Sequence, residues 1–259
     1  MHFELTGTRN FRSLKGLPTV DGRRIADHVI LRSDQLDLLV GPDWEVLQSL
    51  GVKTVCDLRS ANERARHPNS LPIPGLRQVA MEVISDVRAD PTLTAALKSS
   101  PDAQGAVNLM LEVYRRLPAS LAPHLPALFA LFASGEVPVL IHCAAGKDRT
   151  GFAVAVLLHA LGVTPEAILA DYLLSARVEC VSNPVRREMV GDIVSRLAGE
   201  GQNEAMIDAI MDARTDYLET AFAAVAAQYG SMDAYVQSCG GLDAQALQQL
   251  RARWLSDAA

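Results

Sequence analysis

Residues 142–151 read His142-Cys143-Ala144-Ala145-Gly146-Lys147-Asp148-Arg149-Thr150-Gly151, with five residues between the cysteine and the arginine. The apolar run 137–141 in front of them predicts a buried strand, and the apolar residues 152–158 behind them predict a helix. A loop between a strand and a helix presents free backbone N–H groups at the positive end of the helix dipole. We therefore expect residues 142–151 to bind a phosphate-sized anion.

The side chains of this loop supply the chemistry that acts on such an anion. Cys143 faces the bound group, and the helix N-terminus and nearby cations favour its thiolate, which is the nucleophilic form. Attack of the thiolate on phosphorus forms a phosphocysteine intermediate. Arg149 and the loop amides are placed to hold the three equatorial oxygens of the transition state. The residues expected to bind the phosphate are Ala144, Ala145, Gly146, Lys147 and Thr150, whose hydroxyl would also stabilise the departing sulfur.

Several aspartates compete for the role of general acid, which must protonate the leaving oxygen. Asp148, inside the loop, is the favoured candidate. Asp57 ends an expected strand at the edge of the sheet where open α/β sheets bind ligands, which makes it a second candidate for the acid. The alternative is a salt-bridge partner of the nearby Arg59. The third option is an acid on a mobile loop, Asp86 or Asp90.

Three further residues are expected to support the site. His142 either fixes the sulfur through hydrogen bonds to loop carbonyls or is a packed core histidine. Lys147 either binds a second phosphate or acidic group, or is a solvated lysine that raises the local potential. Arg59 either lines the mouth of the pocket or forms an ordinary ion pair.

The loop resembles that of the cysteine-dependent protein tyrosine phosphatase superfamily. Its Lys147-Asp148-Arg149 variant is similar to a narrower bacterial branch, the one that includes mycobacterial protein tyrosine phosphatase B. The resemblance covers roughly the whole chain, although only the loop is specific by itself. Further segments follow that branch in order: Asn10-Phe11-Arg12, Asp21-Gly22-Arg23, Leu31-Arg32-Ser33-Asp34, Cys56-Asp57-Leu58-Arg59-Ser60, and Asp233-Ala234-Tyr235 through Leu242-Asp243.

The resemblance implies an α/β fold, the protein tyrosine phosphatase fold, with a central, mostly parallel sheet flanked by helices in a single domain over residues 1–259. In that branch, extra helices after the phosphate loop can cover the site, and the helical composition of residues 185–229 makes them the candidate lid. The alternatives for residues 204–227 are a partner surface or a plainly packed helix. The implied activity is hydrolysis of phosphotyrosine, with phosphoserine, phosphothreonine or phosphoinositides as further substrates. The basic Lys147 resembles the basic loop residues of lipid-active phosphatases and is compatible with phosphoinositides, but the sequence does not choose among these substrates.

Two other functional classes share features of this loop. A phospho-binding module that recognises phosphate without hydrolysing it would keep Arg149 and tolerate the loss of a nucleophile. A thiol redox or arsenate-reducing enzyme shares the cysteine–arginine spacing but needs partner cysteines close by. The four cysteines are scattered, and no CxxC pair is present: Cys56, Cys143, Cys180 and Cys239.

Composition narrows the class of protein further. Hydrophobic residues make up 49% of the 259 residues, enough for a sizeable core, and the net charge of −6 argues against a nucleic-acid surface. No apolar run reaches the ~18 residues of a membrane span, and residues 1–6 lack the features of a secretory signal. A reducing cytoplasm suits a catalytic thiolate, with export without a cleaved signal left open. No metal or other cofactor is expected.

The rest of the chain divides into elements by punctuation and periodicity. Residues 67–74 hold three prolines and predict a loop, and residues 84–105 lack a clear period. The expected strands are 6–11, 28–32 and 52–58, and the expected helices are 42–50, 107–116, 121–133, 164–178, 185–229 with a break near 199–201, and 243–255.

Overall fold

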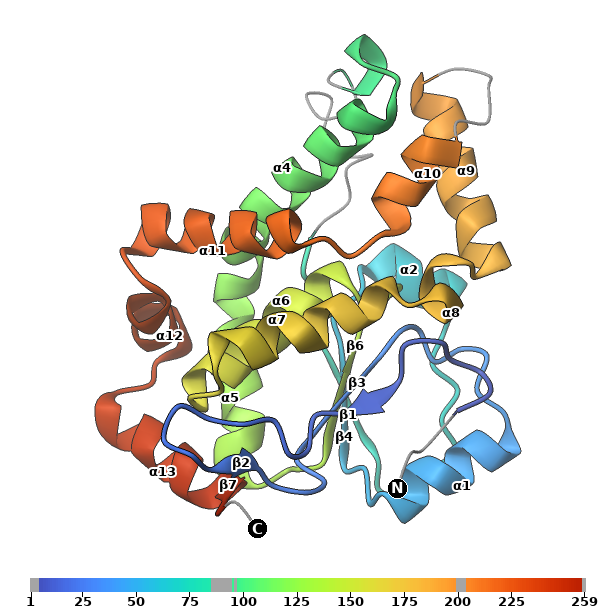
Figure 1. Ribbon diagram of the computed structural model, residues 1–259. Helices are drawn as coiled ribbons and strands as arrows, with labels where there is room; N and C mark the ends of the chain where they lie inside the picture. The colour runs from blue at the N-terminus through green and yellow to red at the C-terminus, as the bar shows by residue number, and fades with distance from the viewer. Residues whose placement is uncertain (1–4, 85–94, 96, 199–203, 258–259) are drawn as a thin grey trace.

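A five-stranded sheet lies at the centre of the computed structural model, which describes residues 5–84, 95, 97–198 and 204–257 (Figure 1). Its strands lie in the order β1-β3-β6-β4-β5, in which β1 is antiparallel to β3 and the other pairs are parallel. The sheet is therefore mostly parallel, as expected. The strands are β1 (Arg12–Ser13), β3 (Ile30–Ser33), β4 (Thr54–Asp57), β5 (Arg77–Ala80) and β6 (Val139–His142), and a separate pair joins β2 (Arg24–Ile25) to β7 (Leu255–Ser256).

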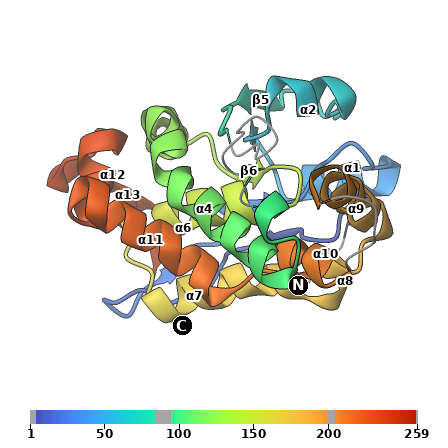
Figure 2. The same cartoon turned by 90° about the horizontal axis from the view of Figure 1, so that it is seen from above.

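Helices cover both faces of this sheet (Figures 1 and 2). α4, α5 and α6 lie on one face, and α1 lies on the other. The helices are α1 (Gly41–Ser49), α2 (Ala61–Arg66), α4 (Ala103–Leu121), α5 (Leu125–Ser134), α6 (Asp148–Ala160), α7 (Pro165–Leu173), α8 (Val178–Val181), α9 (Pro184–Ala198), α10 (Glu204–Met211), α11 (Thr215–Tyr229), α12 (Met232–Gly240) and α13 (Ala244–Trp254), with short 3₁₀ turns η2 (Ala122–His124) and η3 (Leu174–Ala176).

The central strand β6 feeds a hydrophobic core on each face. Val139 and Ile141 belong to the larger core, which is built with α4, α5 and α6. Leu140, between them, points to the opposite face and packs in the smaller core with Leu47 of α1. This alternation is the period of two that a strand imposes on its side chains. Burial on both faces explains why residues 137–141 are apolar without interruption.

Most of the expected helices are confirmed, with differences at their ends. The expected helix 107–116 begins earlier, because Asp102 caps α4 by accepting a hydrogen bond from the Gly105 N–H at 2.8 Å. α4 then continues through Pro118 to Leu121. The helix expected over 164–178 ends at Leu173 and is followed by a 3₁₀ turn and the short α8. The break expected near 199–201 lies outside the described residues.

The short strands differ most from the expectation. The expected strand over residues 6–11 is wrong, because β1 covers only Arg12–Ser13. β5 was not expected: its residues are exposed or half-buried at the edge of the sheet, so they lack the apolar alternation that identifies a strand.

One described helical stretch, Ala103–Ser134, is long and apolar enough by length and composition to cross a membrane. It comprises α4, η2 and α5. Tyr114, Leu117, Leu128 and Phe132 from this stretch are fully buried in the larger core.

Candidate active site

The phosphate loop, residues 143–147, connects the carboxyl end of β6 to the N-terminus of α6. β6 lies between β3 and β4, and all three run parallel, so the loop emerges at the sheet edge where open α/β folds bind ligands. The N–H of Gly146 donates a hydrogen bond to the Cys143 sulfur at 3.2 Å. The strand–loop–helix expectation is confirmed, and the sulfur lies inside the curve of the loop.

Gly146 is required by both backbone conformation and space. Its φ is +63°, in the left-handed region that side chains rarely adopt. A Cβ at this position would lie 2.4 Å from the carbonyl oxygen of Ser33 and 2.6 Å from the nitrogen of Asp34. The loop is therefore packed directly against the backbone that follows β3, and only glycine permits that approach.

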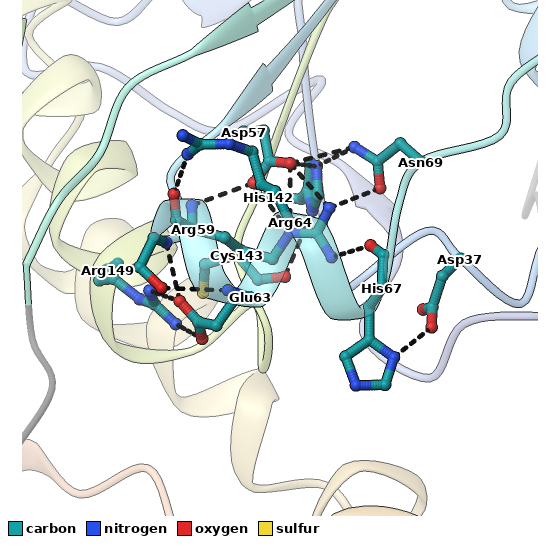
Figure 3. Close-up of polar contacts among 11 residues, drawn as sticks. Asp37, Asp57, Arg59, Glu63, Arg64, His67, Asn69, His142, Cys143 and Arg149 are labelled. Atoms are coloured by element: carbon teal, nitrogen blue, oxygen red, sulfur yellow. Dashed lines mark hydrogen bonds and ion pairs between the residues drawn. The ribbon is translucent and has the colours of Figure 1, made fainter. Parts of the chain in front are cut away.

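The Arg149 guanidinium forms a bidentate ion pair with Glu63 of α2 (Figure 3). Its Nη1 donates to Oε2 at 2.7 Å and its Nη2 donates to Oε1 at 2.8 Å. Arginine has five N–H donors, so this pair leaves Nε–H and one hydrogen on each terminal nitrogen for an anion. Burial would lower the pKa of Arg149, but the hydrogen bonds to Glu63 and the charge of Cys143 raise it, so the guanidinium stays charged.

Glu63 is a site residue that the sequence analysis missed. Its carboxylate also accepts the Ser60 N–H at 2.8 Å, and the Glu63 N–H donates to the Ser60 hydroxyl at 3.2 Å. Burial would raise the pKa of Glu63, but the hydrogen bonds and charge of Arg149 lower it to about 2. The capping-box pattern Ser60-x-x-Glu63 was the available signal, although it identifies a helix start rather than a partner for Arg149.

Asp148 lies at the first position of α6, with its side chain 21% exposed. The Tyr114 hydroxyl donates to its Oδ1 at 2.7 Å, and the Lys147 ammonium lies 3.3 Å from the same oxygen. Burial and the charge of Asp148 raise the pKa of Tyr114 well above its ordinary value, so the phenol keeps its proton. Tyr114 is a second neighbour of the site that the sequence did not reveal.

Lys147 does not extend into an open phosphate pocket. Its ammonium donates to the carbonyl oxygens of Ile210 at 2.6 Å and Asp212 at 2.7 Å, at the end of α10. Its side chain is only 5% exposed, and burial lowers the pKa of Lys147. The expectation of a solvated lysine does not fit this buried side chain, which ties the phosphate loop to the later helices. The expectation of a second phosphate ligand stays a prediction.

Asp57 and Arg59 form a buried ion pair beside the loop (Figure 3). The Arg59 Nη2 donates to Asp57 Oδ2 at 2.8 Å, and its Nη1 donates to the His67 carbonyl at 2.8 Å. Burial would raise the pKa of Asp57, but the hydrogen bonds and charge of Arg59 lower it. This arrangement fits the salt-bridge reading of Asp57 rather than the general acid. Asp86 and Asp90 lie outside the described residues.

His142 is fully buried, and burial lowers its pKa to about 4, so the ring is neutral at neutral pH. The Asn69 amide nitrogen lies 2.9 Å from His142 Nε2. An amide NH₂ only donates, so Nε2 accepts, and the proton on Nδ1 points to the Cys143 carbonyl at 3.2 Å. The hydrogen bond to a loop carbonyl agrees with the supporting role expected of His142.

The Thr150 hydroxyl is buried with no hydrogen-bond partner among the described residues. Two adjoining cavities, with volumes of about 130 and 320 Å³, lie beside the loop; Ala145, Lys147 and Asp148 line the first and Ala144 lines the second. α9 contributes Val190 to the first cavity and α10 contributes Ile210 and Met211. α11, the last part of the expected lid, instead places residues such as Tyr217 and Leu218 in the larger core.

The chain is similar to known proteins over nearly its whole length. A family model described as "Tyrosine phosphatase family" matches residues 3–256 of the chain. A putative tyrosine-protein phosphatase of Cupriavidus necator is 35% identical over 249 residues, covering 95% of this chain and 86% of that protein. The triple specificity protein phosphatase PtpB of Mycobacterium tuberculosis is 31% identical over 274 residues, covering 92% and 93%. The crystal structure of TpbA from P. aeruginosa matches with a TM-score of 0.32 and 20% identity, covering 90% of this chain and 89% of that one.

Proposed function

The chain belongs to the tyrosine phosphatase family, and on that premise we propose that it hydrolyses phosphomonoesters through a phosphocysteine intermediate formed on Cys143. The observation that carries the proposal is the Cys143 sulfur, held by the Gly146 N–H inside the loop that opens α6. A thiolate there faces the site where backbone N–H groups and Arg149 would hold a phosphoryl group.

The first step transfers the phosphoryl group to sulfur. The Cys143 thiolate attacks phosphorus, an S–P bond forms, and the bond from phosphorus to the ester oxygen breaks. Asp148 gives its proton to the departing oxygen, and Tyr114 and Lys147 hold the resulting carboxylate through Oδ1. The free donors of Arg149 and the loop amides hold the three equatorial oxygens during the transfer.

The second step returns the enzyme to its starting state. Asp148, now a carboxylate, accepts a proton from water as the water oxygen attacks phosphorus. The S–P bond breaks, inorganic phosphate leaves and the Cys143 thiolate is restored. The otherwise unpartnered Thr150 hydroxyl is a donor buried beside the loop, and we assign it the role of stabilising the sulfur as it departs.

For substrate class, we propose an ester that carries further negative charge, as a phosphoinositide or an acidic phosphopeptide does. The relative PtpB is named a triple specificity phosphatase. In this chain the Lys147 ammonium is already bound, but Arg9 and Arg186 line both cavities beside the loop, and no ion pair is recorded for either guanidinium within the described residues. The compartment we propose is the cytoplasm, because reducing conditions preserve a nucleophilic thiolate.

The decisive experiment is turnover of 4-nitrophenyl phosphate by the wild-type chain and two variants. We expect Cys143→Ser to lower kcat by at least about 10⁴-fold, because hydroxyl is a far weaker nucleophile than thiolate, while phosphate binding is retained. Arg149→Ala should lower both turnover and phosphate affinity. Wild-type turnover by the Cys143→Ser protein would refute the nucleophile assignment, and phosphate binding without turnover by the wild-type chain would favour a phospho-binding module.

The substrate proposal has a matched test of its own. Arg9→Ala and Arg186→Ala should each raise KM for a soluble inositol bisphosphate by about tenfold, the value of one charge-assisted hydrogen bond, and leave KM for 4-nitrophenyl phosphate unchanged. Arg196→Ala is the control, since Arg196 is an exposed arginine on the same helix as Arg186. Equal effects on both substrates, or an equal effect of Arg196→Ala, would contradict the proposal.

A further inference from the structure

A buried polar cluster packs against the backbone carbonyls of the phosphate loop, and two of its members, Asn10 and Ser175, also line the first cavity beside the loop. Its members come from four separate parts of the fold: the start of β1, β3, α7 and the turn η3. Each is at least about nine-tenths buried. The members are Asn10, Arg12, Arg32, Asp171 and Ser175. The proposed chemical steps do not use any of them.

Two members of the cluster bind the backbone carbonyls of the loop. The Asn10 side-chain amide donates to the carbonyl oxygens of Ala145 and Gly146, each at 3.0 Å. Arg32 Nη2 donates to the same Gly146 oxygen at 2.6 Å. Three donors therefore hold two consecutive loop carbonyls on the side of the cluster.

The peptide group carries this constraint to the substrate side. In a trans peptide the C=O and the following N–H point in opposite directions, and the loop peptides are trans. Holding the Ala145 carbonyl turns the Gly146 N–H the other way, and that N–H does meet the Cys143 sulfur at 3.2 Å. Holding the Gly146 carbonyl likewise turns the Lys147 N–H away from the cluster.

We infer that Asn10 and Arg32 are positioning residues that aim the backbone N–H groups of Gly146 and Lys147 at the thiolate and at a bound phosphoryl group. They act through the two peptide planes whose carbonyl oxygens they bind. Only the effect of these residues on catalysis rests on the proposed function. The orientation of the amides affects anion affinity whether or not the bound anion reacts.

The cluster fixes its own geometry through Asp171. Its Oδ1 accepts from Arg12 Nε at 2.7 Å, and its Oδ2 accepts from Arg32 Nη1 at 2.5 Å. Arg12 also donates to the Asn10 side-chain oxygen, which leaves the Asn10 NH₂ facing the loop. The amide orientation is therefore set by its neighbours rather than by the loop alone.

The same arrangement leaves an excess positive charge behind the loop. Two guanidinium groups share one carboxylate, and burial together with the charge of Arg32 lowers the pKa of Arg12 to about 10, so it stays protonated at neutral pH. An anion on the far side of the loop offsets that charge at short range. Charge and amide orientation therefore favour the same ligand.

Asn10→Asp is the variant that separates aiming from folding. The new carboxylate keeps the size of the side chain and gains an ion pair with Arg12, so we expect the fold to hold. It has no donor for the Ala145 and Gly146 carbonyls, so tungstate, a phosphate mimic, should bind about tenfold or more weakly, measured by calorimetry. KM for 4-nitrophenyl phosphate should rise in the same proportion, while the pH profile of kcat keeps its shape.

Ser175→Ala is the matched control, because Ser175 belongs to the cluster and touches Asn10 and Arg32 without a recorded bond to the loop. It should leave tungstate affinity within about threefold of wild type, as expected for a neutral hydrogen bond. Wild-type affinity in a folded Asn10→Asp protein, or an equal loss in Ser175→Ala, overturns the inference.

Arg32→Lys provides the second arm if Asn10→Asp does not fold. A lysine keeps the positive charge but cannot bridge Asp171 and the Gly146 carbonyl with a rigid fork, so affinity for tungstate should again fall. Unchanged affinity there also overturns the inference. A wild-type chain that binds tungstate without hydrolysing 4-nitrophenyl phosphate defeats the proposed function alone and leaves this test intact.

Discussion

The two sides of the phosphate loop are held in different ways. On the sheet side, its carbonyls are bound by Asn10 and Arg32, which belong to a buried cluster built around the Asp171 carboxylate. On the side of α10, the loop is tied by one flexible side chain, Lys147, to two main-chain oxygens. The loop is thus held on one side by rigid buried groups and on the other by a single lysine side chain, which binds the end of a helix that itself packs in the larger core.

This difference follows the demands of the chemistry. Amides that stabilise a transition state must be fixed before the reaction, since any reorientation costs energy at that moment. A general acid must exchange its proton with solvent, and a cover must let substrate enter. Asp148 is 21% exposed on the side of the cover, whereas the side chain of Arg32 has no exposure at all.

The largest expected effect is the loss of turnover when the proposed general acid, Asp148, is replaced. Asp148→Asn cannot donate the proton, so we expect kcat to fall by about 10²–10⁴-fold for a substrate with a poor leaving group. The pH profile should lose the limb that reports a protonated acid, and an aryl phosphate with a good leaving group should lose much less. An intact limb in Asp148→Asn would move the acid to another residue, including the aspartates outside the described residues.

For Asp57→Asn we expect the opposite result: the variant should lose folding stability and keep the acid step. Removing one partner of the buried pair with Arg59 should cost about 3 kcal/mol of unfolding free energy at neutral pH, measured by urea denaturation. The pH profile of kcat should keep its acid limb.

The pH dependence of that loss follows from the sign of the shift. The pKa of Asp57 is lower in the folded protein than in the unfolded chain, because Arg59 stabilises the charged carboxylate despite burial. The unfolded chain therefore binds more protons as the pH falls. The stability gap between wild type and Asp57→Asn should be full above about pH 4 and shrink as the pH drops further. A gap that grows in acid would contradict the structural role.

Glu63→Gln tests a third contact near the phosphate loop, the ion pair that holds Arg149. It keeps an acceptor for the Ser60 N–H but weakens the bidentate pair with Arg149. We expect kcat/KM to fall by about 10–100-fold, the range for hydrogen bonds to a charged group. Ser60→Ala is the control, because it removes half of the helix cap and leaves the pair intact: it should cost about 1 kcal/mol of stability with little change in kcat/KM.

The sequence predicted the parts of this site that are local in the chain. The strand, loop and helix around Cys143 are contiguous, and their apolar pattern and glycine at 146 follow from local geometry. His142 and Asp148 became candidates for the same reason, since His142 precedes Cys143 in the chain and Asp148 precedes Arg149.

The partners that sequence reasoning missed come from distant segments. Glu63 lies 86 residues from Arg149, and Tyr114 lies 34 residues from Asp148. No spacing or period connects such pairs, and each has a sufficient local reading, as a helix cap or a core aromatic. The partners of Lys147 could not be predicted for a related reason: they are main-chain carbonyls at the end of α10, which any sequence there would supply.

The smallest expected effect concerns the attachment of the cover. Lys147→Met fills similar space but cannot donate to the Ile210 and Asp212 carbonyls, so opening of α10 should become easier. Amide hydrogen exchange in residues 204–211 should speed up by about fivefold to tenfold, the value of roughly one net hydrogen bond, while β6 is unchanged. Arg187→Gln is the control, because Arg187 ties α9 to the exposed Glu204 and Asp208 and surface pairs contribute about 0–1 kcal/mol. If both variants speed exchange equally, the two bonds of Lys147 contribute no more than a surface ion pair, and the contrast between the two ways in which the loop is held would lose its basis.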